Sequence, residues 1–237
     1  MAPAGALGRL TERARIRAGS LGDERALQRM AESAPPAPSF ELALRQGPVS
    51  VIAELKRRSP SRGPLNESID AAERAHLYEE GGAAALSILT EPSEFGGALE
   101  DIQEARRSCR LPVLRKDFHV VPAQLFEART AGASAVLLIV RALGPDDTRL
   151  MADTAREAGL DAVFEVRDDT ELAWALDARA TIIGVNKRNL ETLEMEDGVV
   201  ERIIPLIPAD LLAIAESGVS TRRDVEQVAL LGADAVL

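Results

Sequence analysis

The chain has 237 residues, of which 46% are hydrophobic and 3% aromatic, and its net charge at pH 7 is −10. The length fits one α/β barrel or two small domains built on an aliphatic core. Nucleic acids and anionic membranes bind clustered basic residues, so the acidic balance argues against both as partners, and no apolar stretch is long enough to span a membrane. The lone cysteine, Cys109, excludes a disulfide within the chain and predicts a reducing, cytoplasmic compartment.

Residues 1–47 differ in character from the rest of the chain. A polar, arginine-rich stretch of helical character comes first, a proline-rich run follows at 34–38, and a short apolar segment lies at 40–44. Proline cannot continue a helix, so the run at 34–38 is predicted to be an extended connector. We therefore expect an N-terminal helical extension over 1–47, ahead of a separate domain over 48–237.

Short apolar runs alternate with longer segments of helical pattern from residue 49 onward. The runs are apolar at consecutive positions, which is typical of parallel strands buried between helices. The predicted strands are 49–55, 83–88, 111–114, 135–140, 162–166, 181–185, 211–215 and 234–237. The predicted helices are 69–80, 99–107, 122–131, 145–158, 169–176, 198–204 and 221–231.

Seven strand–helix units followed by an eighth strand fit a (β/α)8 barrel, or TIM barrel. A helix end, a glycine and a strand start recur at 80–85, 131–136 and 231–236, which is a weak internal repeat of such a unit. A doubly wound open sheet is the alternative, although it would normally carry a glycine-rich turn after its first strand. The sequence stops within the eighth predicted strand. We therefore expect a barrel truncated within or just after strand 8, without its last helix. The sequence does not decide whether this barrel is closed.

Polar side chains follow six of the predicted strands, where the strand ends of a barrel converge on one mouth and chemistry is placed. The chain has three lysines against twenty-five arginines, and Lys56, Lys116 and Lys187 all come just after apolar runs. Lysine can lose its proton when it is desolvated, whereas arginine stays charged. Lys56 and Lys116 are therefore candidates for proton transfer or compact anion contact, and a plain surface role is equally open for Lys187.

Two acidic positions also stand out. Glu54 lies two residues before Lys56, so both side chains point to the same side of a strand and can form a buried acid–base pair. Glu165 is embedded in an apolar strand, and burial would raise its pKa toward the range useful for proton transfer. The small residues after Glu216 lead toward a helix N-terminus and indicate a phosphate seat. Neither histidine has the spacing of a metal ligand, so no metal site is predicted.

Several of these segments together resemble the indole-3-glycerol phosphate synthase family, over about residues 49–237. The resemblance rests on the segments 52–63, 89–92, 95–97, 111–118, 136–139, 183–186, 188–190 and 215–218. It implies a carboxy-lyase of tryptophan biosynthesis that converts 1-(2-carboxyphenylamino)-1-deoxyribulose 5-phosphate to indole-3-glycerol phosphate without a cofactor. The implied partner is this small phosphorylated substrate, and the expected state is a monomer or weak homo-oligomer.

The resemblance also implies individual roles. Lys116 is the expected general acid of ring closure and Glu165 its partner acid/base, while Lys56 with Glu54 holds the substrate carboxylate and assists decarboxylation or dehydration. Asn186 and Glu216 complete the polar ring. The implied substrate-binding residues are Ser59, Phe95, Phe118, Leu137, Ile139, Arg188, Leu190, Ser217 and Gly218, the last two at the phosphate and the apolar ones around the anthranilate ring.

Two alternatives remain at this level. The first is a non-catalytic phosphosugar-binding relative that keeps the site. The second is another phosphosugar barrel such as phosphoribosylanthranilate isomerase, which needs a cysteine near a strand end that this sequence does not offer. The resemblance further implies that residues 1–47 form a lid. It places part of the phosphate seat after strand 8, beyond Leu237, so weak phosphate binding is expected.

Overall fold

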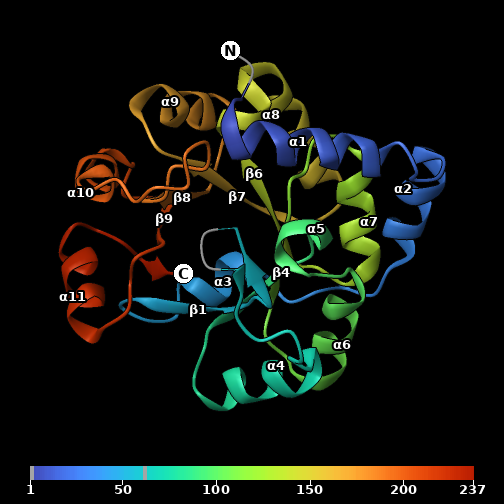
Figure 1. Cartoon of the computed structure of the whole chain (residues 1–237), viewed down its shortest axis with the longest axis horizontal. Helices are drawn as coiled ribbons and strands as arrows, with labels where there is room; N and C mark the ends of the chain where they lie inside the picture. The colour runs from blue at the N-terminus through green and yellow to red at the C-terminus, as the bar shows by residue number, and fades with distance from the viewer. Residues whose placement is uncertain (1–2, 61–62) are drawn as a thin grey trace.

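The computed structural model describes residues 3–60 and 63–237, and its central feature is a closed barrel of eight parallel strands surrounded by helices (Figure 1). The barrel strands are β1 (Ser50–Leu55), β4 (Ala85–Leu89), β5 (Val113–Lys116), β6 (Ala135–Ile139), β7 (Asp161–Val166), β8 (Ile182–Asn186), β9 (Leu212–Glu216) and β10 (Ala235–Val236). The predicted barrel is confirmed. Closure, which the sequence left open, is provided by β10, which pairs with both β9 and β1. Two motif residues, Ser61 and Arg62, lie outside the described residues.

The outer helices follow the predicted order, with one difference in the middle of the chain. They are α4 (Ala71–Glu80), α6 (Glu100–Ser108), α7 (Ala123–Ala131), α8 (Val140–Glu157), α9 (Asp169–Asp177), α10 (Val199–Ile203) and α11 (Arg222–Leu230). The helix predicted from residue 145 is preceded by a further helical turn that begins at Val140, and non-helical Gly144 separates the two. Pro145 fits the start of the second part because its missing N–H would be unpaired there in any case.

Several helix starts are fixed by side chains that accept backbone N–H groups. Asp70 accepts from Glu73 at the start of α4, and Asp168 accepts from Glu171 at the start of α9. Thr221 forms a reciprocal capping box with Asp224 before α11. Each cap satisfies donors that the first turn of a helix leaves unpaired, so the loops that lead from the strands into these helices have defined ends.

The strands divide the core into an inner and an outer part. In β6, Ala135, Leu137 and Ile139 face the barrel interior, whereas Val136 and Leu138 pack beneath the surrounding helices. This alternation is the period of two that a strand imposes on its side chains. Both faces are apolar because each is covered, and this explains the continuous hydrophobic runs in the sequence.

The N-terminal segment contributes three helices, α1 (Gly5–Ala18), α2 (Glu24–Ser33) and α3 (Phe40–Leu44), and the proline-rich run before α3 is not helical. The fully buried Phe40 and Leu44 of α3 join the inner core, as do Leu7 and Leu10 of α1. The α3 start is held at the beginning of β7, where Asp161 accepts the N–H groups of residues 40 and 41. The segment therefore seals the N-terminal end of the barrel with α3 and covers the opposite end with α1.

Two smaller elements flank the barrel mouth. Strands β2 (Arg58–Ser59) and β3 (Gly63–Pro64) form an antiparallel pair after β1, and α5 (Pro92–Phe95) follows β4. None of the helices within residues 3–60 and 63–237 combines the length and the apolar character needed to cross a membrane.

Candidate active site

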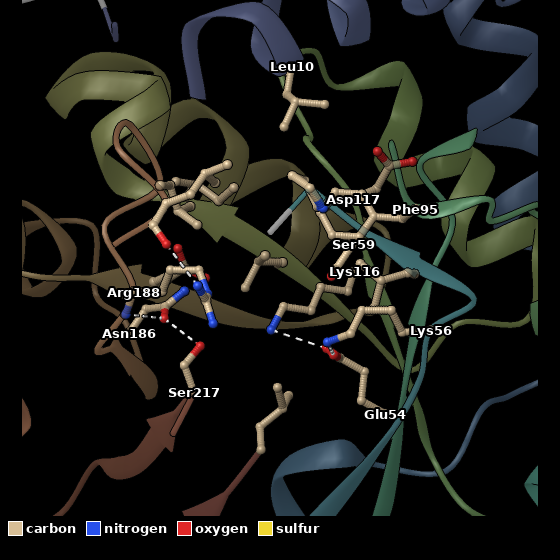
Figure 2. A pocket seen from close by; sticks show the side chains of 18 of the residues that line it. Leu10, Glu54, Lys56, Ser59, Phe95, Lys116, Asp117, Asn186, Arg188 and Ser217 are labelled. Atoms are coloured by element: carbon tan, nitrogen blue, oxygen red, sulfur yellow. Dashed lines mark hydrogen bonds and ion pairs between the residues drawn. The ribbon is translucent and has the colours of Figure 1, made fainter. Parts of the chain in front are cut away.

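A cavity of about 380 Å³ opens at the C-terminal ends of the barrel strands (Figure 2). Of the fifteen predicted site residues, all but Glu216 line it: Glu54, Lys56, Ser59, Phe95, Lys116, Phe118, Leu137, Ile139, Glu165, Asn186, Arg188, Leu190, Ser217 and Gly218. Glu216 lies beside the cavity and contacts one of its lysines. The structure thus brings together side chains from seven strands or strand ends. A volume of this size suits a small-molecule ligand.

The lysines and carboxylates of the site form one alternating chain of charges. Lys116 Nζ lies 2.9 Å from Glu216 Oε2 and 3.5 Å from Glu54 Oε2. Lys56 Nζ pairs with the other oxygen of Glu54, Oε1. Figure 2 shows Lys56 and Lys116 converging on Glu54 from two strands. The predicted pairing of Glu54 with Lys56 is therefore present, and Lys116 joins it.

These contacts keep Lys116 of β5 and Glu54 of β1 ionised. Burial acts to lower the pKa of Lys116, but Glu216, Glu54 and Glu165 outweigh it and raise the pKa above its usual value. Burial acts to raise the pKa of Glu54, but Lys116 and Lys56 lower it on balance. Lys116 therefore carries its proton at neutral pH and can donate it to an oxygen atom that gains negative charge.

Glu165 has the opposite character. It is 3% exposed, and burial, with a contribution from the charge of Glu216, raises the pKa of Glu165 to about 8. Lys116 and the amide of Asn186 act in the other direction but do not cancel burial. A carboxyl group with this pKa exchanges a proton near neutral pH, which is the property expected of a general acid/base.

Replacing Glu165 by Gln is expected to raise the free energy of unfolding at pH 8 by a few kcal/mol, at about 1.4 kcal/mol per pKa unit. The pKa of this carboxyl rises from 4.5 to about 8 on folding, so the folded wild type binds the extra proton and loses stability as pH rises through this window. The advantage of Glu165→Gln should grow over the same window and vanish below pH 4. Urea unfolding at pH 4, 6 and 8 measures it. A difference that is constant with pH would contradict the raised pKa.

Glu216 occupies a position that depends on a glycine in the neighbouring strand. Its Oε1 is buried without a hydrogen-bond partner among the described residues, while Oε2 accepts from Lys116. A Cβ atom placed on Gly184 of β8 would lie 2.1 Å from Glu216 Oε1, far inside van der Waals contact. The glycine therefore makes the space that the carboxylate needs in order to reach Lys116.

The turn after β9 supplies the polar side of the mouth. Ser217 and Gly218 both have positive φ, at 66° and 77°. Asn186 Oδ1 accepts hydrogen bonds from Ser217 Oγ and from the N–H of Arg188, both at 2.9 Å. The expectation that this segment leads into a helix N-terminus is confirmed, because α11 begins at Arg222, after the cap at Thr221. The turn itself lines the cavity.

The cavity lining also includes residues that sequence reasoning missed, most of them apolar. Those are Leu10, Pro60, Leu65, Leu89, Asp117, Leu193, Val219 and Leu237. Leu10 belongs to α1 and points toward the cavity in Figure 2. The helical spacing of Leu7, Leu10 and Ala14 was the signal for a buried stripe on this helix. Its partner surface could not be found from the sequence, because the stripe contains no information about the element that it packs against.

Lys187, the third lysine that follows a strand, and the histidine His119 do not line the cavity. Lys187 Nζ lies 2.7 Å from Asp197 Oδ1 in an ion pair, and the side chain of Asp197 is 94% exposed. Lys187 therefore has the surface role that the sequence left open. His119 is buried, and its Nδ1 lies 2.8 Å from the carbonyl oxygen of Leu137. Within residues 3–60 and 63–237, no group of three or more His, Cys, Asp and Glu side chains is arranged to hold a metal ion.

Comparisons with known proteins point to one family. The family model of indole-3-glycerol phosphate synthase matches residues 10–237. A protein of that name from Parafrankia sp. (strain EAN1pec) is 51% identical over 205 residues, which cover 85% of this chain and 76% of the relative. Another from Opitutus terrae is 46% identical over 221 residues, 90% of this chain and 83% of the relative.

Solved structures of lower identity share the fold. The tryptophan synthase alpha-subunit of Pyrococcus furiosus, in a mutant form, superimposes with a TM-score of 0.60 at 18% identity, over 79% of this chain and 85% of that one. N-acetylmannosamine-6-phosphate 2-epimerase of Clostridium perfringens gives 0.63 at 15% identity, over 86% and 91%. These structures show the fold alone, whereas the sequence matches, which cover most of the chain, show the family. The chain belongs to the indole-3-glycerol phosphate synthase family.

Proposed function

We propose that the chain is a carboxy-lyase that converts 1-(2-carboxyphenylamino)-1-deoxyribulose 5-phosphate to indole-3-glycerol phosphate, as the family name implies. The observation that carries the proposal is the placement of Lys116. Its ammonium is held between Glu54 and Glu216 beside the acid/base Glu165, in a cavity lined by both polar and apolar side chains. The single cysteine supports a reducing, cytoplasmic location as a further part of the proposal.

Ring closure needs an acid at the ketone oxygen. The aromatic carbon that bears the carboxylate attacks the ketone carbon, and Lys116 gives its proton to the oxygen, which becomes a hydroxyl group. The bond to the carboxylate then breaks, CO2 leaves, and its electron pair restores the aromatic ring. The Lys56 ammonium, positioned by Glu54, is assigned to hold that carboxylate, and the apolar side chains of the lining favour loss of charge as CO2.

Dehydration completes the indole ring. The hydroxyl group takes a proton and leaves as water, and the neighbouring methylene carbon loses a proton to form the double bond. Glu165 is suited to this exchange because its pKa of about 8 allows both protonation states near neutral pH. The sugar phosphate is assigned to the turn of Ser217 and Gly218 with Ser59, and the anthranilate ring to the apolar wall around Phe95 and Phe118.

The direct test is turnover by the purified chain. Incubation with the carboxyphenylamino substrate is expected to produce indole fluorescence together with one equivalent of CO2. Thermal stabilisation by the substrate without product would instead support the non-catalytic phosphosugar-binding relative. Phosphoribosylanthranilate isomerase is disfavoured by position, because the buried Cys109 follows α6 and does not line the cavity.

We further propose that α1 acts as a lid over the substrate. The helix places Leu10 on the cavity and is attached at three points of the barrel mouth. Ala6 N–H donates to the carbonyl oxygen of Glu191 at 3.0 Å, Arg13 donates to Glu94 at 2.8 Å, and Arg17 donates to the buried Asp117 at 2.7 Å. Of these, the Arg17 contact is the least exposed to water, so it should matter most.

Replacing Arg17 by Ala is expected to raise KM by about tenfold while kcat changes less. Arg115 and Arg17 together overcome burial and lower the pKa of Asp117 to about 2, so loss of one guanidinium removes a hydrogen bond to a charged group worth about 1.5–3 kcal/mol. The matched control is Arg13→Ala, because the Arg13–Glu94 pair is exposed and such pairs are worth about 1 kcal/mol or less. Steady-state kinetics of both variants measures the effect. Equal KM values in the two variants would contradict the assignment.

A further inference from the structure

A second, much smaller cavity of about 10 Å³ lies behind Glu165. Its polar lining residues are Arg141, Glu165, Arg167, Glu171 and Glu191. Glu165 lines the large cavity as well, so one carboxyl group has a face in both. The small cavity has room for about one water molecule. Its walls offer such a molecule several hydrogen-bonding partners.

The buried acid of the small cavity is Glu171, in the first turn of α9. It is 3% exposed, and its Oε2 accepts the backbone N–H of Arg167 at 2.8 Å. Burial raises the pKa of Glu171 to about 7, with a contribution from Asp168, while the backbone N–H of Arg167 and the charges of Arg141 and Arg167 act in the other direction. The negative charge of Glu171 in turn contributes to the raised pKa of Glu165. Glu165 and Glu171, which line the same small cavity, therefore both change protonation state near neutral pH.

The remaining wall leads toward solvent. Arg141 of α8 lies 4.0 Å from Glu171 and 3.6 Å from Glu191, and its side chain is 31% exposed. Arg167 also lines the cavity, and its Nε–H is buried without an acceptor among the described residues. A water molecule is an acceptor that such a site can hold. The charged groups around Glu171 are thus Asp168 and Arg167 on its own segment, Arg141 of α8, Glu165 of β7 and Glu191 of the loop after β8.

The proposed reaction consumes a proton from solvent in every turnover. A substrate carboxylate leaves as neutral CO2, so the charge balance requires one added proton. Two protons enter the substrate, at the ketone oxygen and at the departing hydroxyl, and one returns from the methylene carbon. Glu165 gives one proton and takes one back, so Lys116 ends each cycle one proton short, and Glu165, whose charge acts on Lys116, can pass a proton on to it. With α1 over the mouth and a ligand in the large cavity, the direct path from solvent is covered.

We propose that Glu171 relays this proton from solvent to Glu165 through a water molecule in the small cavity. The Glu171 carboxyl gives its proton to the water, the water gives one of its own to the Glu165 carboxylate, and Glu171 is then reprotonated from the side of Arg141 and Glu191. Glu165 then gives the proton to the Lys116 amine, where the N–H bond lost in ring closure forms again. All other changes are exchanges of O–H bonds, and each group returns to its starting state. The relay rests on the proposed function, because only that reaction creates the demand for a proton.

Glu171→Gln tests the relay, since the amide keeps the size of the side chain but cannot pass on a proton. Wild-type turnover, measured first, tests the proposed function separately. In the variant, steady-state kcat is expected to fall about tenfold, while the single-turnover rate of enzyme protonated in advance stays within about twofold of wild type. Added imidazole, a small proton carrier, should restore kcat. Equal loss in both rates without an imidazole response, or an unchanged kcat, would overturn the relay.

Two further variants separate the relay from a structural role of Glu171. Asp168→Ala removes the cap of the same helix but keeps the Glu171 carboxyl, so its kcat should stay within about twofold of wild type. Glu171→Asp keeps a titratable group with a shorter reach. It should lose kcat several-fold and recover it with imidazole, which keeps the test decisive if Glu171→Gln does not fold. A loss in Glu171→Asp that imidazole leaves unchanged would also overturn the relay.

Discussion

Replacing Lys116 by Met is expected to lower kcat by about 10³-fold, the usual contribution of a general acid. Methionine fills a similar volume but has no proton to give to the ketone oxygen. The kinetic measurement is the formation of indole fluorescence at saturating substrate. Substrate binding, followed by thermal stabilisation, should persist because the apolar wall and the Ser217 turn are unchanged.

The same variant is expected to unfold more readily. Without Lys116, the carboxylates of Glu54 and Glu216 share a buried site with one counterion fewer, and breaking a buried ion pair costs about 3–5 kcal/mol. Protonation of either carboxylate relieves the repulsion, and the pKa of Glu54, which Lys116 helps to lower, should rise in the variant. The loss of stability should therefore be smaller at pH 5 than at pH 8, and urea unfolding at the two pH values measures this.

Lys187→Met provides the matched control. Lys187 also follows a barrel strand, but its partner Asp197 is almost fully exposed and neither residue lines the cavity. Such surface pairs are worth about 0–1 kcal/mol, so both turnover and stability should stay near wild type. Turnover by Lys116→Met at the wild-type rate would reject the proposed function. A pH-independent loss of stability would reject only the charge argument.

Strand order and strand ends could be predicted because they rest on local patterns. The apolar runs give the eight strands, and a barrel then places Glu54, Lys116 and Glu165 at one mouth, since residues at the C-terminal ends of parallel strands converge. Which of these side chains would contact one another was harder to predict from the sequence. Lys116 reaches Glu216 at 2.9 Å because β5 and β9 face each other across the barrel, which no sequence spacing records.

The N-terminal segment shows where sequence patterns lose information. A helical stretch and the connector were predicted, and the resemblance implied a lid, but it was not predicted that the short apolar segment would form α3 and fill one end of the barrel. Arg17 looked like one of many surface arginines, and it is the buried Asp117, 100 residues away, that gives it a specific role. The kink at Gly144 was missed for a related reason: a glycine before a proline marks a helix start but does not exclude a helical turn before it.

Replacing Gly184 by Ala is expected to lower kcat by about 10²-fold although the residue does not line the cavity. The new Cβ would lie 2.1 Å from Glu216 Oε1 and 3.2 Å from Val163 Cγ1. Glu216 is the movable partner, so its carboxylate should turn away and leave Lys116 without its closest counterion. Folding should lose about 1–3 kcal/mol, the range for an overpacked interior. Gly47→Ala is the control, because nothing lies within 4 Å of its Cβ position and its φ is not positive.

A double-mutant cycle separates this explanation from general damage to the barrel. Glu216→Asp shortens the carboxylate by one methylene group and makes room for a Cβ at Gly184, at the expense of its reach to Lys116. If the clash with Glu216 is the cause, adding Gly184→Ala to Glu216→Asp should cost little further activity, so the losses are strongly non-additive, by about 1.4 kcal/mol or more in activation free energy. Losses that simply add would mean that Gly184→Ala acts through Val163 or the β8 backbone. The Lys116–Glu216 contact would then not depend on the glycine.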